Sequence, residues 1–94
     1  MSTLAETSTI SLEDVYAHLW YVTVLNDDVT PFSLVEFALM SICGHTREAA
    51  HALTSLIHNE GRAVVAVSSK EEEALLICAK LTSLKIQAIV TTAS

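Results

Sequence analysis

The chain has 94 residues and a hydrophobic fraction of 51%, which suits one domain with a real core. Its 11 acidic and 5 basic side chains give a formal net charge of −6, which disfavours nucleic acid and anionic membranes as partners and favours a cationic ligand. No apolar run reaches the ~20 residues that span a bilayer, and the polar first residues lack the basic segment of a signal peptide. We expect a cytoplasmic protein, with Cys43 and Cys78 as reduced core residues in two helices.

Residues 1–17 are expected to form a flexible N-terminal extension, and residues 18–94 a single core domain. The beginning of the extension is rich in Ser and Thr without an apolar period, which is typical of flexible tails. Its second part is ambiguous, because Leu12 and Val15 are spaced as on a helix. Any helix there should end by His18.

A strand that runs into a polar corner begins the core. Residues 19–25 are apolar, aromatic or β-branched without interruption, which predicts a strand pressed against a core. Asn26, Asp27 and Asp28 follow, and their short polar side chains favour a turn because they bond to nearby backbone groups. These side chains either form a binding site or are turn residues and nothing more.

Two helices should follow the corner. Thr30 is predicted to cap the first helix, with Pro31 at its first position. Gly44 should end this helix, Thr46 should cap the second, and Gly61 should end the second. Apolar residues at intervals of three and four, with others beside them, predict that the first helix is buried on more than one side: Val35, Ala38, Leu39, Ile42, Phe32, Phe37 and Met40. The second helix should point five side chains inward: Ala49, Ala50, Leu53, Leu56 and Ile57.

The rest of the chain alternates between strand and helix. Residues 62–67 are predicted to form a second strand, and residues 86–91 a third. Between them, Ser69 and Glu72 form a predicted capping box for a helix that runs to about Thr82. The β-α-α-β-α-β order predicts an α+β fold, a three-stranded antiparallel sheet with three helices packed on one face.

Two separated motifs in the chain resemble the ClpS family, the adaptors of the bacterial and plastid Clp protease. The first is LNDDVTP at residues 25–31, with Val35 four residues further on. The second is HNEGRAV at residues 58–64, which is similar to the family's His-x-x-Gly-Lys/Arg-Ala segment. The resemblance covers about residues 21–67. It implies the same fold, also seen in the C-terminal domain of the ribosomal stalk protein, and a location in the cytoplasm or the plastid stroma.

The resemblance also implies a binding site. In the family, the corresponding side chains bind the free α-amino group of a protein's first residue, and an apolar pocket takes its side chain. Asn26 and His58 would accept hydrogen bonds from this amine, and Asp28 would hold it through its charge, since an ammonium group needs such acceptors. The pocket would be lined by Phe32, Val35, Thr54 and Ile57.

Two pocket positions depart from the family pattern. Phe32 and Thr54 stand where many members carry Met. An aromatic ring is stiffer than a thioether chain and should narrow the entrance, whereas Thr54 removes volume deeper in the pocket. We therefore expect a hydrophobic but shifted choice of first residue, with Leu as the safest ligand.

The preferred interpretation is a non-enzymatic adaptor that captures such N-terminal signals (N-degrons) for an AAA+ unfoldase of the ClpA or ClpC type. Lys70 and Glu71 lie where the family contacts this partner. The alternative is a ClpS-like regulatory domain that docks on the unfoldase without selecting N-degrons. An enzyme is disfavoured because no set of nucleophile, base and oxyanion donor is present. We expect a monomer without a cofactor. We expect no metal either, because zinc-ligand spacing is missing among Cys43, His45, His51 and His58.

Overall fold

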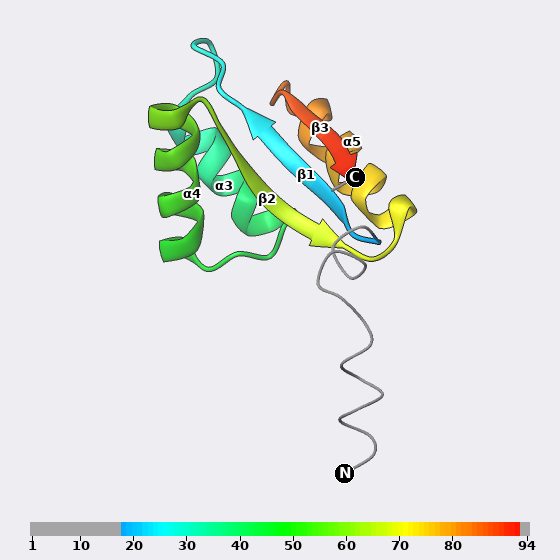
Figure 1. The fold of residues 1–94 in the computed structure, drawn as a ribbon. Coiled ribbons are helices and arrows are strands. Elements are labelled where there is room, and N and C mark those ends of the chain that lie inside the picture. Colours follow the sequence, from blue (N-terminus) through cyan, green and yellow to red (C-terminus); the bar gives the residue numbers. More distant parts are fainter. Residues whose placement is uncertain (1–17, 93–94) are drawn as a thin grey trace.

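The computed structural model describes residues 18–92. Strand β1 lies at the centre of a three-stranded sheet and pairs antiparallel with β2 on one side and β3 on the other (Figure 1). This arrangement confirms the predicted α+β fold. The predicted extension at residues 1–17, with any helix in it, lies outside the described residues. The elements are β1 (Trp20–Leu25), α3 (Phe32–Ser41), α4 (Arg47–Glu60), β2 (Arg62–Ser68), α5 (Glu71–Ser83) and β3 (Ala88–Thr92).

The helices cover one face of the sheet. On that face β1 contributes Val22 and Val24, which are 0% and 1% exposed, and β2 contributes Ala63 and Val65. Helix α5 packs across the sheet, mainly on β1 and β3, while α4 packs against β2 and α3 packs against α4 (Figure 1). The opposite face carries apolar side chains that remain 39% to 51% exposed, namely Val64, Val67 and Ile89.

A β-bulge interrupts the pairing of β1 with β2. Val22 pairs with Ala66 and Thr23 pairs with Val64, so Val65 is an extra residue on the bulged strand. The Val65 carbonyl accepts a hydrogen bond from the His45 Nε2–H at 2.6 Å. Because a carbonyl only accepts, this contact places the proton on Nε2. The bond ties the loop between α3 and α4 to the sheet.

Helix α3 begins differently from the prediction. Pro31, not Thr30, is the N-cap residue, and its extended backbone lets its carbonyl accept from the N–H groups of Leu34 and Val35. The residue before a proline is disfavoured in helical conformation, which keeps Thr30 outside the helix. The Thr30 hydroxyl instead donates to the Lys85 carbonyl at 3.4 Å.

The predicted capping box of α5 is wrong by one residue at each position. Strand β2 continues through Ser68, and the helix begins at Glu71 after an extended Lys70. The Ser68 hydroxyl, in place of Ser69, accepts from the Lys70 N–H at 3.0 Å and donates to the Glu73 carboxylate at 2.8 Å.

Helix α4 has the predicted ends. The Thr46 side chain accepts a hydrogen bond from the Ala49 N–H at 3.2 Å, which satisfies one of the free donors of the first turn. Gly61 follows the helix with φ of +95°, a left-handed conformation that glycine adopts without steric strain.

The helices bury less of their surface than the sequence predicts. Phe37 is 62% exposed and Met40 is 38% exposed, so the prediction that α3 is buried on more than one side is wrong. The inward placement of Leu56 on α4 is also wrong, because this side chain is 46% exposed. A helix in a single layer over one sheet buries only one stripe, and on α3 that stripe is Val35, Ala38 and Leu39.

Both cysteines are free thiols of intermediate burial. Cys78 lies in α5 as predicted, and its Sγ–H donates to the Ala88 carbonyl at 3.3 Å. Cys43 lies in the turn after α3, which ends at Ser41, so its predicted helical position is wrong. Burial raises the pKa of the Cys43 thiol. Between residues 18 and 92, no helix combines the length and the apolar character needed to cross a membrane.

Candidate functional site

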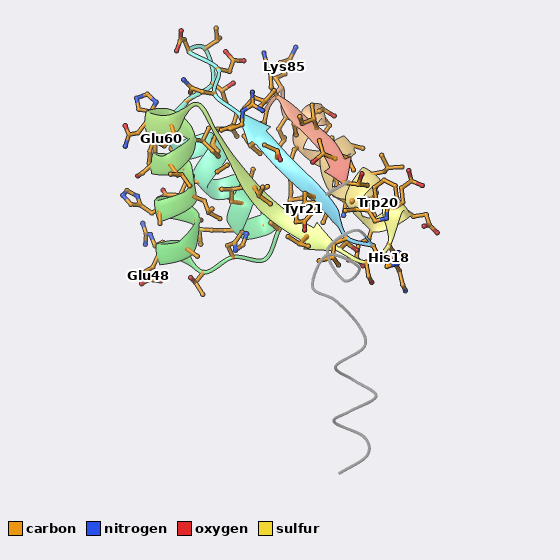
Figure 2. The ribbon with its side chains drawn as sticks, viewed as in Figure 1. His18, Trp20, Tyr21, Glu48, Glu60 and Lys85 are labelled. Carbon is orange, nitrogen blue, oxygen red and sulfur yellow. The ribbon has the colours of Figure 1, made fainter. Side chains whose placement is uncertain are left out.

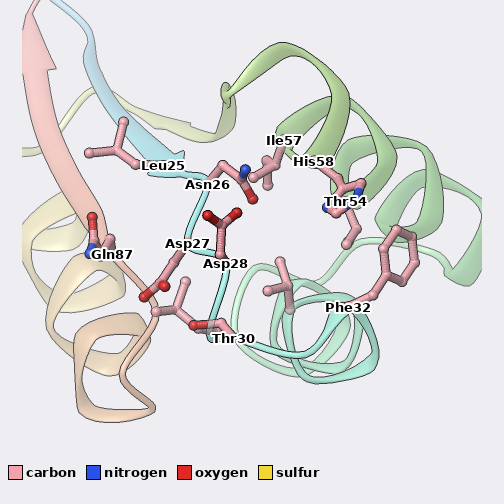
Figure 3. A pocket seen from close by; sticks show the side chains of 12 residues that line it. Leu25, Asn26, Asp27, Asp28, Thr30, Phe32, Thr54, Ile57, His58 and Gln87 are labelled. Carbon is pink, nitrogen blue, oxygen red and sulfur yellow. The ribbon is translucent and has the colours of Figure 1, made fainter.

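A cavity of about 120 Å³ opens at the end of the sheet where β1 ends and β2 begins (Figure 3). Pockets for drug-sized ligands and cofactors run to roughly 300–1,000 Å³, so this cavity has the size for one side chain. The structure brings all seven residues predicted for amine and side-chain binding to its lining: Asn26, Asp28, Phe32, Val35, Thr54, Ile57 and His58.

Backbone hydrogen bonds connect the polar corner, residues 26–28, to the end of α4. The Asn26 N–H donates to the Gly61 carbonyl at 2.9 Å, and the Gly61 N–H donates to the Ile57 carbonyl at 2.9 Å. The left-handed turn at Gly61 therefore starts β2 directly beside the last residue of β1. Because of this pairing, Asn26 and Asp28 face His58, in the last turn of α4, across the cavity (Figure 3).

Apolar side chains form one wall of the cavity. Val35 is 7% exposed and Ile57 is 3% exposed, while Phe32, at the start of α3, is 37% exposed. Thr54 is 2% exposed, and its hydroxyl donates to the Ala50 carbonyl one turn earlier at 2.7 Å. Since this hydroxyl is engaged within α4, Thr54 adds a small and mainly apolar surface to the cavity.

The polar side chains at the cavity fall into two groups. Asp27 is engaged, because its Oδ1 accepts from the Val29 N–H at 2.9 Å and so holds the turn. Among the described residues, the side chains of Asn26, Asp28, His58 and Gln87 have no hydrogen-bond partner. The groups that are available to a ligand are therefore two carboxamides, a carboxylate and an imidazole.

The charge of the lining favours a cation. It includes the carboxylates of Asp27 and Asp28 and contains neither Lys nor Arg. A carboxylate, a carboxamide oxygen and a neutral imidazole nitrogen all accept hydrogen bonds, whereas an ammonium group offers three donors. The arrangement suits a ligand with an ammonium group next to an apolar group. Within residues 18–92, the cavity included, no three His, Cys, Asp or Glu side chains form a group that could hold a metal ion.

The sequence does not reveal the contribution of the segment before β3. Ile86 and Gln87 line the cavity, and the Leu25 N–H donates to the Gln87 carbonyl at 2.9 Å. These residues reach the site only because β3 pairs with β1, which is a contact between distant parts of the chain. Their local sequence carries no signal for a binding site. Leu25 and Thr30 also line the cavity, and their place beside the corner in the sequence was enough to predict this.

Lys70 and Glu71 lie far from the cavity, at the start of α5. They follow Ser68, which pairs with Trp20 at the opposite end of β1 from Asn26. Figure 2 shows these two ends of the domain, with Glu60 and Lys85 at one and Trp20 at the other. The predicted unfoldase contact and the predicted amine site are thus on separate ends of the sheet.

The fold and the cavity together define a small α+β domain with an acidic corner beside an apolar pocket. The family model for "ATP-dependent Clp protease adaptor protein ClpS" matches residues 16–88, which is well over half of the chain. The chain therefore belongs to the ClpS family of Clp protease adaptors.

Individual relatives agree with this assignment. The chain is 36% identical over 59 residues to the ClpS adapter of Mycolicibacterium paratuberculosis, an alignment that covers 63% of this chain and 56% of the relative. It is 40% identical over 53 residues to the ClpS adapter of Leptothrix cholodnii, covering 56% of this chain and 46% of the relative. The match thus spans about half the length of these curated relatives.

A solved structure has the same fold. Agrobacterium tumefaciens ClpS2 bound to L-phenylalaninamide superimposes with a TM-score of 0.74, at 24% sequence identity, over 79% of this chain and 95% of that chain.

Proposed function

We propose that this domain binds the free α-amino group and the hydrophobic side chain of a protein's first residue and delivers that protein to a Clp AAA+ unfoldase for degradation. One observation carries the proposal: Asn26, Asp28 and His58, three polar side chains without a protein partner among the described residues, border one small cavity with an apolar wall. A chain's first residue joins an ammonium group and a side chain at a single carbon. L-phenylalaninamide, the ligand of the similar ClpS2, also combines a free amine with a hydrophobic side chain, which supports this class of ligand.

Each lining residue has a proposed role. The Asn26 carboxamide oxygen and a neutral His58 ring nitrogen accept hydrogen bonds from the ammonium group. Asp28 attracts the same group through its charge, with a water molecule between them. Asp27 keeps the turn in place rather than binding the ligand. The side chain of the ligand enters the space lined by Phe32, Val35, Thr54 and Ile57.

These contacts predict a moderate affinity. Hydrogen bonds to a charged group contribute roughly 1.5–3 kcal/mol each, and burial of a Leu or Phe side chain contributes about 1.5–3 kcal/mol. Lost translational and rotational freedom and side-chain ordering cancel a large part of this sum. The net value, on the order of −8 kcal/mol, corresponds to a micromolar dissociation constant.

The small cavity also predicts a selective choice of first residue. The Phe32 ring stands beside Thr54 at the cavity (Figure 3) and is stiffer than a thioether chain would be. Since the wall opposite the polar corner is apolar, polar first residues such as Ser gain little there. We expect Leu to bind best, and large aromatic residues to bind less well than Leu.

Delivery needs a second surface for the unfoldase. Lys70 and Glu71 are the proposed contacts, and their place at the far end of the sheet leaves the cavity free while the unfoldase is bound. The unfoldase would be of the ClpA or ClpC type. The alternative function, a regulator that docks on the unfoldase without selecting N-degrons, uses only this second surface.

A double variant distinguishes these two functions. Asn26→Ala with Asp28→Ala removes two of the three side chains proposed to bind the amine. The matched control Asn59→Ala with Glu60→Ala removes an amide and a carboxylate that do not line the cavity. Binding of a Leu-initiated peptide and of the unfoldase is measured by calorimetry. The adaptor function predicts that the first variant loses peptide binding by at least tenfold and keeps unfoldase binding, while the control keeps both. Peptide binding that survives in the first variant would refute amine capture at this corner.

A further inference from the structure

A contact on the outside of the cavity holds the Phe32 ring. The rings of Phe32 and His51 approach edge to face, with centroids 5.3 Å apart and an interplanar angle of 60°. His51 is in turn fixed by Glu36, whose Oε2 lies 2.8 Å from the His51 Nδ1. Phe32 and Glu36 lie one turn apart on α3, and His51 reaches them from α4. The three side chains form a connected row from the cavity to the surface.

We infer that His51, oriented by Glu36, is a positioning residue that sets which first-residue side chains the cavity admits. This inference rests on the proposed function. Phe32 is the only one of the three that lines the cavity, so His51 and Glu36 act on the ligand through the ring and not by touching it. With the ring held in place, the entrance suits Leu better than Trp. Without this support the half-exposed ring can change rotamer, and the entrance widens.

The contact between Glu36 and His51 orients the His51 ring but adds little to the stability of the fold. A carboxylate accepts from the Nδ1–H, which fixes the ring plane of His51 against Phe32. The His51 side chain is 64% exposed and that of Glu36 is 22% exposed, so solvent screens the contact and its contribution to folding is small. Loss of the pair should therefore change selectivity more than stability.

Four variants of the full chain test this positioning role. His51→Ala removes the edge contact, whereas His51→Phe keeps an aromatic partner for Phe32 without the link to Glu36. Glu36→Ala removes the acceptor, whereas Glu36→Gln keeps a carbonyl oxygen that can accept from the Nδ1–H. Dissociation constants are measured by calorimetry for peptides that differ only in a first residue of Leu, Phe or Trp. Melting followed by circular dichroism checks that each variant is folded.

We expect His51→Ala and Glu36→Ala to lower the preference for Leu over Trp by about two- to tenfold, the range of an aromatic edge contact. Glu36→Gln should keep the wild-type preference, and His51→Phe, which keeps the aromatic edge but not the link to Glu36, should fall between the wild type and His51→Ala. An unchanged preference in the folded alanine variants, with normal binding by the wild type, overturns the inference and leaves the proposed function intact. A wild-type chain that binds none of the three peptides overturns the proposed function itself.

Discussion

Neutralising Asp28 tests the electrostatic part of the site. Asp28→Asn keeps the size of the side chain and removes its charge. Two unit charges about 4 Å apart attract by about 1 kcal/mol in water and about 4 kcal/mol at the effective permittivity near a protein surface. Asp28 is exposed, and in the proposed binding mode a water lies between its carboxylate and the ammonium group, so we expect about 1–1.4 kcal/mol. The dissociation constant for a Leu-initiated peptide should rise about five- to tenfold.

Calorimetry at low and at high salt measures this effect. Added salt should weaken the wild type more than Asp28→Asn, since only the wild type has this attraction to lose to screening. Asp27→Asn is the matched control, because asparagine can still accept the hydrogen bond from the Val29 N–H at the same position. We expect the control to change affinity by less than about threefold. Equal effects of the two substitutions, or salt-independent binding by the wild type, would refute the role given to Asp28.

Two further predictions concern residues outside the cavity. His45→Ala removes the hydrogen bond to the partly buried Val65 carbonyl and should lower the free energy of unfolding by about 1–3 kcal/mol in urea titrations; undiminished stability would contradict the role of this bond. In a Cys78→Ser background, Cys43 should react slowly with iodoacetamide at neutral pH and faster as the pH rises, because burial raises the pKa of its thiol and the thiolate is the nucleophile. Labelling at neutral pH as fast as that of free cysteine would show this to be wrong.

Local signals in the sequence predict most of the fold. The uninterrupted apolar run before Asn26 gives β1, Thr46 and Gly61 mark the ends of α4, and the order of elements gives the sheet. The errors in the predicted helix starts lie where a neighbouring residue can cap the helix equally well. Ser68 rather than Ser69 holds the start of α5, because β2 extends one residue further than its apolar pattern indicates.

Burial and distant contacts are harder to predict. An apolar helix face does not tell how many layers cover it, and here one layer leaves Phe37 and Leu56 exposed. Ile86 and Gln87 reach the cavity through the pairing of β3 with β1, which depends on residues more than sixty positions apart. The contact of His51 with Phe32 is also hard to predict from the sequence, because the two rings meet only when α3 packs against α4.

The central claim is that the cavity captures a free, positively charged protein terminus. Calorimetry with two copies of one Leu-initiated peptide, one with a free amine and one N-acetylated, tests it most directly. Acetylation removes the charge and most of the donors while the Leu side chain stays the same. The account predicts micromolar binding of the free peptide and at least a tenfold loss on acetylation. Equal affinity of the two peptides would contradict it.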